Sequence, residues 1–323
     1  INAPLRPSYG GHEKGRMEMD DKEGGNELRN WAELTQVCLI NILLRLSLPE
    51  RWRGAMRVCK SWFQACKDSC LNAIFDIESQ FESVTEFPRY WTPDFERKID
   101  SMLRSVVLWS DGSLHTIRVR HCSDYSLALV AERSPMLRVL SVKNSPHVTD
   151  EIMWNIGSHC PLLRELDISF CYEISHKSLS LIGQHCPNLQ ILRRNFMNWL
   201  DPSQHVGIVP KEYLDACPQD GDLEAAAVGK FMPQLLQLEI QFSKLSNKGL
   251  TLISEGCTEL EHLDLSGCAN VTSREISNVS LNLKKLKTMK KPNFYIPRSV
   301  FHTERYGHWQ LYDERFQTDV FRI

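Results

Sequence analysis

Residues 163–189 read LRELDISFCYEISHKSLSLIGQHCPNL, and this stretch decides the fold. It opens with the apolar spacing L-x-x-L-x-L, formed by Leu163, Leu166 and Ile168. Alternate side chains of a strand point to the same face, so this spacing predicts a short strand with one buried side. Ser175 can cap a following helix over residues 177–184, and Pro187 stops that helix before the next strand.

The same apolar spacing recurs along the chain, which indicates an internal repeat. Seven copies are visible: Leu114, Ile117 and Val119; Leu137, Leu140 and Val142; Leu163, Leu166 and Ile168; Leu189 and Leu192, with Arg194 in the third place; Leu235, Leu238 and Ile240; Leu260, Leu263 and Leu265; and Leu283, Leu286 and Thr288. Their middle residues are separated by 23, 26, 26, 46, 25 and 23 residues. All spacings except the long one fall in the range of roughly 20–29 residues that leucine-rich repeats have, and the long one contains an insertion.

A cysteine signature accompanies the repeats, three residues after the last apolar strand position, at Cys122, Cys171 and Cys268. Leucine-rich repeats carry Asn or Cys at this place, and residues 114–286 resemble their cysteine-containing subclass. The resemblance implies an α/β fold, in which a curved solenoid has parallel strands on its concave face and helices on its convex face. Further helices are predicted over residues 151–158 and 248–255, each after a Ser or Thr cap.

A different pattern precedes the repeats, in residues 31–77. Apolar residues share one face of a first predicted helix: Leu39, Ile42, Leu43 and Leu46. Pro49 ends that helix and suits the first turn of a second one, and a third begins around residues 58–62. The region therefore predicts a small helical bundle, close to the lower size at which a single core stabilises itself.

Residues 34–46, together with the run VCKSW at 58–62, resemble the F-box, whose usual form is L-P, then I-L/L, then V-C-K-x-W. F-boxes bind the Skp-type adaptor of cullin–RING (SCF) ubiquitin ligases. The resemblance places adaptor-facing or bundle-forming positions at Leu34, Ile42, Leu46, Val58, Cys59 and Trp62. Thr35 stands where the family usually has Pro. Leu39, Leu43 and Met56 are predicted to form the core of the bundle.

An F-box followed by cysteine-type repeats, with RRN at 193–195 and KPNFY at 291–295, is similar to plant F-box/leucine-rich-repeat proteins. This similarity implies a non-catalytic substrate-recognition subunit of an SCF ubiquitin ligase. The F-box would bind the Skp-type adaptor and, through it, the cullin and RING subunits, while the repeats hold a protein substrate for ubiquitination. The alternative is a leucine-rich-repeat interaction scaffold without a degradative role.

The predicted domain organisation has five parts. They are a leader over 1–30, the F-box over 31–77, a linker and N-terminal solenoid cap over 78–110, the repeats over 111–290, and a tail over 291–323. The native start is predicted at Met17, a helix at 95–108 within the solenoid cap, and an insertion at 196–221 within the repeats. The insertion is either a recognition element or a flexible loop, and Asp222 is predicted to cap a helix over 223–231.

Side chains that alternate with the buried leucines face the concave surface. This row comprises Arg118, Arg120, Val139, Ser141, Lys143, Glu165, Asp167, Ser169, Ile191, Arg193, Asn195, Gln237, Glu239, Gln241, His262, Asp264, Ser266, Lys285 and Lys287. It is basic at both ends and acidic in the centre, which predicts docking of a basic protein segment, with a merely solvated charged face as the alternative. The predicted substrate contacts are Glu165, Asp167, Arg193, Glu239, His262 and Asp264.

In the tail, eight of the 29 aromatic residues are interleaved with Arg, a pattern that can stack on single-stranded nucleic acid. A terminal repeat also needs its open end covered, so a cap or a partner surface is favoured. The net charge of −2 gives no global attraction to nucleic acid or to a membrane surface. No membrane-length apolar run, nucleophile elbow, phosphate-binding glycine loop or paired-Cys zinc spacing is present, so neither cofactor nor metal is predicted. The odd count of 11 cysteines suits reduced thiols, and the predicted location is the nucleus and/or cytoplasm.

Overall fold

The structure is a computed structural model that describes residues 31–81, 88–215 and 221–292. The chain divides into two units, residues 1–34 and residues 35–323. In the first unit, the described residues form the short 3-10 helix η1 (Trp31–Glu33). All other elements belong to the second unit. The predicted leader and most of the predicted tail lie outside the described residues.

The second unit contains an eight-stranded parallel sheet whose strands follow one another in chain order. The strands are β1 (Ile74–Asp76), β2 (Thr116–Arg120), β3 (Val139–Lys143), β4 (Glu165–Asp167), β5 (Ile191–Arg193), β6 (Gln237–Glu239), β7 (His262–Asp264) and β8 (Thr288–Lys290). Because each strand pairs only with its neighbours along the chain, the sheet is a stack of repeats, as predicted.

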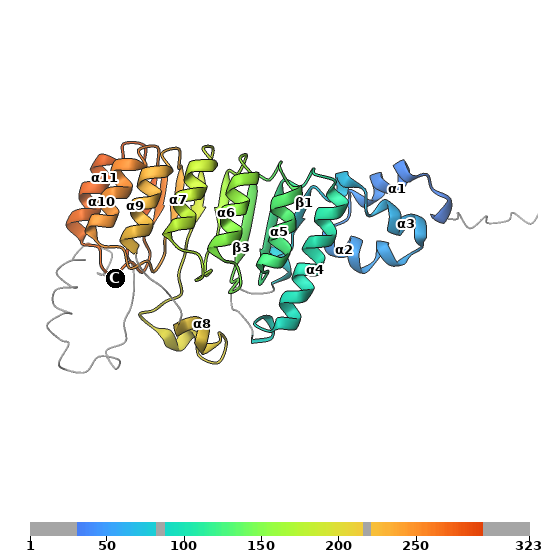
Figure 1. The fold of residues 1–323 in the computed structure, drawn as a ribbon, viewed down its shortest axis with the longest axis horizontal. Coiled ribbons are helices and arrows are strands. Elements are labelled where there is room, and N and C mark those ends of the chain that lie inside the picture. The colour runs from blue at the N-terminus through green and yellow to red at the C-terminus, as the bar shows by residue number, and fades with distance from the viewer. Residues whose placement is uncertain (1–30, 82–87, 216–220, 293–323) are drawn as a thin grey trace, which may run out of the picture. The chain divides into compact units, whose positions relative to one another are not determined.

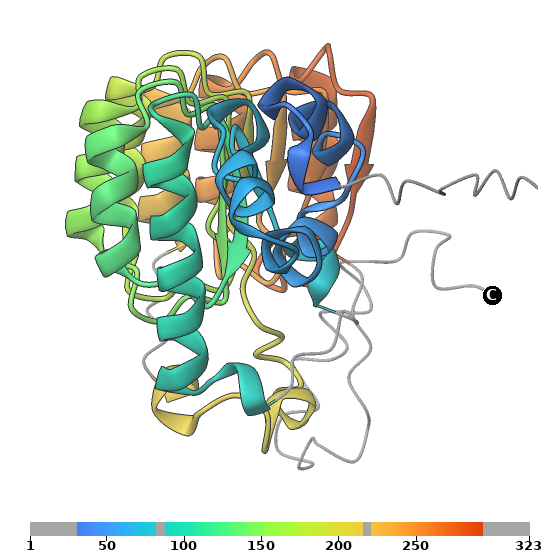
Figure 2. The same ribbon diagram turned by 90° about the vertical axis from the view of Figure 1, so that its right-hand side faces the viewer.

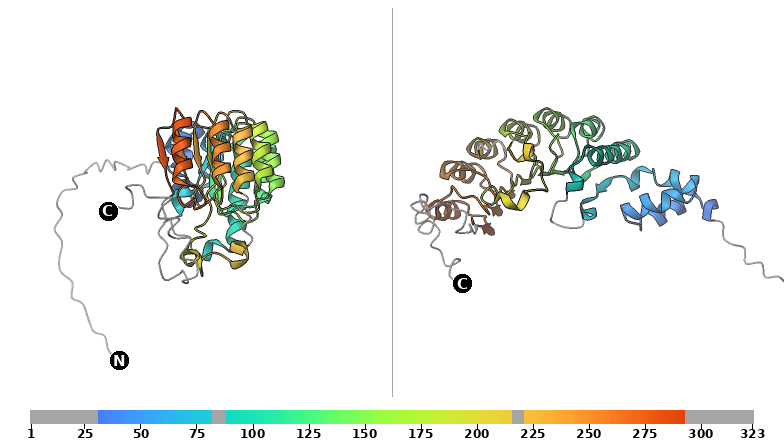
Figure 3. Two further views of the ribbon diagram at one scale, coloured as in Figure 1. Left: turned by 90° about the vertical axis from the view of Figure 1, so that its left-hand side faces the viewer. Right: turned by 90° about the horizontal axis from the view of Figure 1, so that it is seen from below.

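Helices form a second layer that covers one face of the sheet, as Figures 1 and 2 show. These helices are α4 (Pro93–Ser110), α5 (Asp124–Arg133), α6 (Asp150–His159), α7 (His176–His185), α9 (Gly221–Phe231), α10 (Asn247–Gly256) and α11 (Ser273–Asn282). The view from below in Figure 3 shows the strands on the inside of the curved stack and the helices on its outside. The predicted fold class is confirmed.

The strand register confirms the predicted repeat phase except at its end. Ile117, Leu140, Leu166, Leu192, Leu238 and Leu263 are aligned across β2–β7. Leu263 then pairs with Met289, whereas the sequence analysis placed Leu286 there. The seventh copy was therefore predicted three residues too early, and the concave row ends with Thr288 and Lys290 instead of Lys285 and Lys287. The reason is that Leu286 occupies the turn before β8, where its N–H donates to Leu283 O at 3.1 Å.

The sheet begins one repeat earlier than predicted. In β1, the fully buried Phe75 pairs with Ile117, so a strand lies inside the range predicted as F-box. The helix predicted to close the N-terminal end is α4, which packs beside α5 in the helix layer and is therefore the helix of the first repeat. Trp52 contacts Phe75 and Trp109 with ring centroids 6.5 and 5.5 Å away, so the F-box region itself covers this end of the sheet.

The F-box region forms three short helices, α1 (Gln36–Leu43), α2 (Leu48–Arg53) and α3 (Lys60–Ala65), with the 3-10 turns η2 (Ala55–Arg57) and η3 (Ser69–Leu71). The side chain of Thr35 caps α1 by accepting from Cys38 N. Ser47 N donates to Glu50 at 2.7 Å in the first turn of α2, where Pro49 also lies. The first helix ends at Leu43, so Leu46 lies beyond the helix to which the sequence pattern assigned it.

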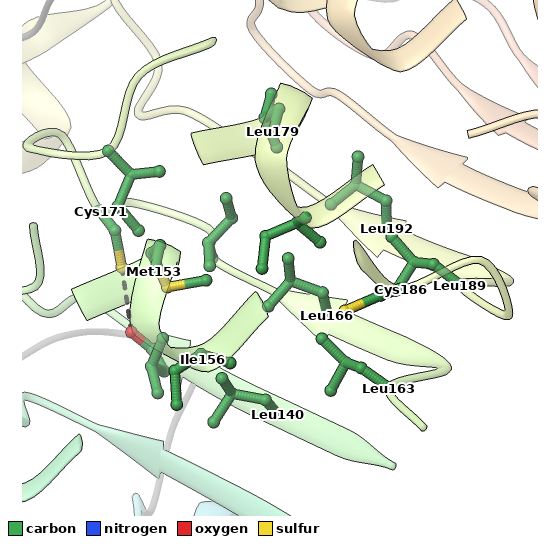
Figure 4. Close-up of a cluster of buried hydrophobic side chains, with 14 of the residues drawn as sticks. Leu140, Met153, Ile156, Leu163, Leu166, Cys171, Leu179, Cys186, Leu189 and Leu192 are labelled. Atoms are coloured by element: carbon green, nitrogen blue, oxygen red, sulfur yellow. Dashed lines mark hydrogen bonds between the residues drawn. The ribbon is translucent and has the colours of Figure 1, made fainter. Parts of the chain in front are cut away.

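Cysteine side chains act as small hydrophobic donors between the repeats. The thiol of Cys171 donates to Val142 O at 3.0 Å, as Figure 4 shows, and Cys268 does the same to Ile240 O at 3.1 Å. Burial raises the pKa of Cys171 and Cys268 to about 12, so both thiols stay protonated. All ten cysteines among the described residues are free thiols.

Asp or Asn side chains of the helices, in the first turn of each helix except α4, bind the N-cap residue of the helix in the next repeat. Asp150 accepts from Ser175 N at 2.8 Å and from Ser175 Oγ at 2.6 Å. The same arrangement joins Asp100 to Ser123, Asp124 to Thr149, Asp222 to Ser246 and Asn247 to Thr272. Asp222 therefore lies inside α9 and is not the cap predicted for that helix. These hydrogen bonds link consecutive repeats, because each N-cap residue bonds to the helix of the preceding repeat as well as to its own helix.

Asp150→Ala is expected to lower the free energy of unfolding by roughly 1.5–3 kcal/mol at pH 7, because hydrogen bonds to a charged group contribute about that much. Asp150→Asn should have a smaller effect, since Asn247 fills the equivalent place in α10 and its Oδ1 accepts from Thr272 N at 2.9 Å. Urea unfolding of the two variants and the wild type measures both values.

The effect of Asp150→Ala should also depend on pH. Burial alone would raise the pKa of Asp150, but hydrogen bonds from Ser175 and Ser178 outweigh it and the pKa is lowered. A carboxyl group with a lowered pKa contributes stability that is complete above its unfolded pKa of about 4 and is lost as pH falls through the folded pKa. The difference between wild type and Asp150→Ala should therefore shrink below about pH 4, and a pH-independent difference would contradict this account.

Candidate functional site: protein interaction surfaces

The predicted adaptor contacts are surface or half-buried residues of the helical region. They are Leu34, Ile42, Leu46, Val58, Cys59 and Trp62. Val58 is 57% exposed, and the other five are intermediate. Leu34 belongs to the first unit, while the other five positions belong to the second. Their role in binding stays a prediction.

The predicted bundle core is distinct from these positions. Leu39 and Leu43 are fully buried, as expected for core residues, whereas Met56 is only half-buried. Two apolar residues that the sequence analysis did not single out, Val37 and Leu44, are 68% and 56% exposed. They lie seven residues apart, on one side of α1, because seven residues make two helical turns. These two side chains add to the exposed apolar surface of the helical region, to which Val58 also belongs.

The predicted concave residues are brought together by the sheet, where ion pairs connect strands that are adjacent or one strand apart. Glu165 lies between two arginines, 3.0 Å from Arg118 and 2.6 Å from Arg193. Arg193 also contacts Glu239 at 3.1 Å. These four side chains form a continuous ladder of alternating charge over β2, β4, β5 and β6. The charges were predicted from the sequence, but their pairing was not.

Two further concave carboxylates are almost fully buried. Asp167 is 2% exposed and lies 3.5 Å from Lys143, and Asp264 is 4% exposed and lies 3.0 Å from Lys290. Burial raises the pKa of Asp167. Burial also acts on Asp264, but there hydrogen bonds from Ser266, Lys290 and others outweigh it and lower the pKa.

The acidic centre predicted from the sequence is therefore neutralised by neighbouring strands. Asp167 and Asp264 have too little exposed surface to test substrate docking by charge reversal, because a lysine there would bury a second cation. His262 is half-buried at the C-terminal part of this face, where its Nδ1 lies 2.6 Å from Thr288 Oγ1. The contact of these residues with a substrate stays a prediction.

Arg194, the residue that interrupts the apolar spacing, is 1% exposed. Its guanidinium donates to the carbonyl oxygens of Cys171 and Ile174, both at 2.6 Å, and forms an ion pair with Glu224 at 3.0 Å. It thus bonds the turn that follows β4 to helix α9. An arginine at an apolar repeat position is the sequence signal for this role, which was not predicted.

The insertion is packed against the repeats at its described residues. It contains the 3-10 turn η6 (Pro202–His205) and the short helix α8 (Lys211–Asp215). Tyr172 packs with Phe196, Met197, Val209 and Tyr213 in a buried cluster outside the main core. Tyr172 and Tyr213, whose ring centroids are 4.8 Å apart, join the repeat to the insertion. The described part of the insertion is therefore packed against the repeats, and a recognition role for it stays a prediction.

Across residues 31–81, 88–215 and 221–292, no group of three or more His, Cys, Asp or Glu side chains is arranged to hold a metal ion. Within the same described residues, no helix has the length and apolar character needed to span a bilayer.

The fold defines a class of protein, a leucine-rich-repeat protein with an N-terminal helical module. F-box protein SKIP1 from Arabidopsis thaliana is 55% identical over 296 residues, which is 91% of this chain and 98% of that protein. Putative F-box/LRR-repeat protein 19, also from Arabidopsis thaliana, is 50% identical over 296 residues, which is 90% of this chain and 98% of that protein. The chain belongs to the F-box/leucine-rich-repeat family of plants, and the resemblance identified from its sequence is confirmed. Proteins of this family are generally non-catalytic adaptors.

No protein-family model matches the chain. Among solved structures, the complex of Rad7 and Elc1 in yeast matches at 13% sequence identity, covers 79% of this chain and 64% of that chain, and has a TM-score of 0.34. At this score we draw nothing from the likeness.

Proposed function

We propose that the chain is the substrate-recognition subunit of an SCF ubiquitin ligase. The F-box helices bind a Skp-type adaptor, and the repeats hold a protein substrate for ubiquitination. The observation that carries this proposal is the set of exposed apolar side chains, Val37, Leu44 and Val58, on the helical module of a family member. The chain itself contributes no chemistry, because ubiquitin transfer in such ligases takes place at the RING-bound conjugating enzyme. Its place of action is the nucleus and/or cytoplasm.

A pull-down with purified Skp-type adaptor tests the proposal. Val58→Asp is expected to weaken adaptor binding at least about tenfold, because a carboxylate desolvated in an apolar interface has no partner. Val206→Asp is the matched control, since Val206 is also largely exposed but lies in the insertion. Circular dichroism of both variants verifies that they fold.

The possible outcomes separate the two functions that the sequence left open. Loss of binding in Val58→Asp, with binding retained in Val206→Asp, supports the receptor. If the wild-type chain does not bind the adaptor, the receptor proposal is wrong and the protein is a repeat scaffold. Substrate capture is then tested by recovering ubiquitinated proteins with the wild type and with Val58→Asp, because only an adaptor-bound receptor changes their ubiquitination.

A further inference from the structure

A pocket of about 530 Å³ opens between the insertion and the segment that leads into α4. One wall is formed by residues 90–93 and 96, and the opposite wall by Pro210, Glu212 and Tyr213. The base comes from the turns that follow β2, β3 and β4. Figures 1 and 2 show α8 beside the beginning of α4. The volume of the pocket is in the range of roughly 300–1,000 Å³ that ligand pockets have.

The pocket combines aromatic rings with carboxylates from three elements. The rings of Trp91 and Tyr213 are in contact, with centroids 4.9 Å apart, and join the two walls. Glu96 lies in α4 and is 2.6 Å from His147, also a lining residue. The two other carboxylates, Glu173 and Glu212, have no ion-pair partner among the residues that the structure describes, and no Lys or Arg lines the pocket.

A hydrogen-bond donor in the pocket also lacks a partner. The indole Nε1 of Trp91 is buried and has no acceptor among the described residues. A buried donor without an acceptor is unfavourable by about 1–3 kcal/mol. On the concave face, by contrast, Glu165, Asp167, Glu239 and Asp264 all have cationic partners. Unmatched negative charge beside apolar surface is therefore a feature of this pocket.

We propose that this pocket binds a short basic segment of the substrate protein, with an Arg or Lys side chain placed against the rings of Trp91 and Tyr213. The rings attract the cation through their π faces, and Glu173 and Glu212 neutralise its charge. The proposal rests on the proposed function, because a receptor subunit needs a site that selects a protein segment. It places recognition at the insertion instead of on the concave strands.

Selection from a phage library of random 12-residue peptides, carried out on the immobilised full chain, tests the proposal. Enriched peptides should carry Arg or Lys beside an apolar residue. Fluorescence polarisation of an enriched peptide should show at least about tenfold weaker binding to Glu173→Lys/Glu212→Lys than to the wild type. The matched control is Glu132→Lys/Glu255→Lys, which makes the same change of net charge on exposed last turns of α5 and α10.

Three outcomes would overturn the proposal. One is a selection that enriches no peptides, and a second is enriched peptides that bind Glu173→Lys/Glu212→Lys as tightly as the control. The third is enrichment only on a full chain whose four C-terminal arginines, Arg298, Arg305, Arg315 and Arg322, are replaced by Ser, because the occupant is then the chain's own tail. The selection contains no adaptor, so its result is independent of the adaptor pull-down. If the pull-down fails while peptide binding is intact, the receptor role is rejected but peptide binding by the pocket is not.

Discussion

Arg194→Leu is expected to destabilise the protein by about 3–5 kcal/mol, although leucine would restore the apolar spacing of the repeat. The guanidinium is buried and satisfies the carbonyl oxygens of Cys171 and Ile174 together with the carboxylate of Glu224. Leucine would fill part of the space but donate no hydrogen bond. Glu224 would then keep a charge with no partner, and the two carbonyl groups would stay buried without donors.

Urea unfolding of Arg194→Leu, beside Arg193→Leu as the matched control, measures this effect. Arg193 also contacts two glutamates, but its side chain is 24% exposed and water can replace part of what is lost. Its replacement should therefore destabilise the protein much less. Arg194→Leu/Glu224→Leu should regain part of the loss, because it removes the unpaired carboxylate. If the single variant Arg194→Leu were as stable as the wild type, the buried contacts of Arg194 would contribute nothing to the free energy of unfolding.

The fold was predictable from the sequence because each repeat carries several agreeing signals. Leu140, Leu166 and Leu192 fix the strands, and the caps and cysteines that follow fix the turns and helices. Where only one signal was present, the prediction failed. Strand β1 buries a single large residue, Phe75, and the C-terminal strand has Met289 where Leu286 gave the better match to the pattern.

The candidate sites were less predictable, because contacts between residues distant in sequence determine their chemistry. The partners Arg118 and Glu165 are 47 residues apart and meet only through the register of the strands. The pocket depends even more on tertiary structure, since Trp91 and Tyr213 come from two irregular segments that no periodicity connects. In the helical module, core and surface apolar residues share the same spacing, so burial alone distinguishes Leu43 from Val58.

Gly256→Ala is the second substitution for which we expect a large effect, a destabilisation of about 3 kcal/mol or more, at the upper end of what overpacking does. Gly256 ends α10 where this helix meets α9, and a Cβ there would overlap the carbonyl oxygen and the Cα of Gly229. Both atoms belong to the backbone of a packed helix, so no side-chain rotation can relieve the overlap. The two helices would have to separate, and the leucines beneath them would lose contacts.

Gly157→Ala is the matched control, because Gly157 also lies in a helix that faces its neighbour. There the nearest atom to an added Cβ is Ile182 Cδ1 at 3.2 Å, the end of a side chain that can move. Alanine also favours a helix over glycine by up to about 1 kcal/mol, so this variant should stay within about 1 kcal/mol of the wild type. Urea unfolding compares the two variants, and amide hydrogen exchange locates the effect. Because stability in a solenoid is carried by interfaces between neighbouring repeats, Gly256→Ala should weaken protection mainly in α9 and α10. Equal stability of the two variants would mean that the helices can separate at little cost, in contradiction to the close contact between Gly229 and Gly256.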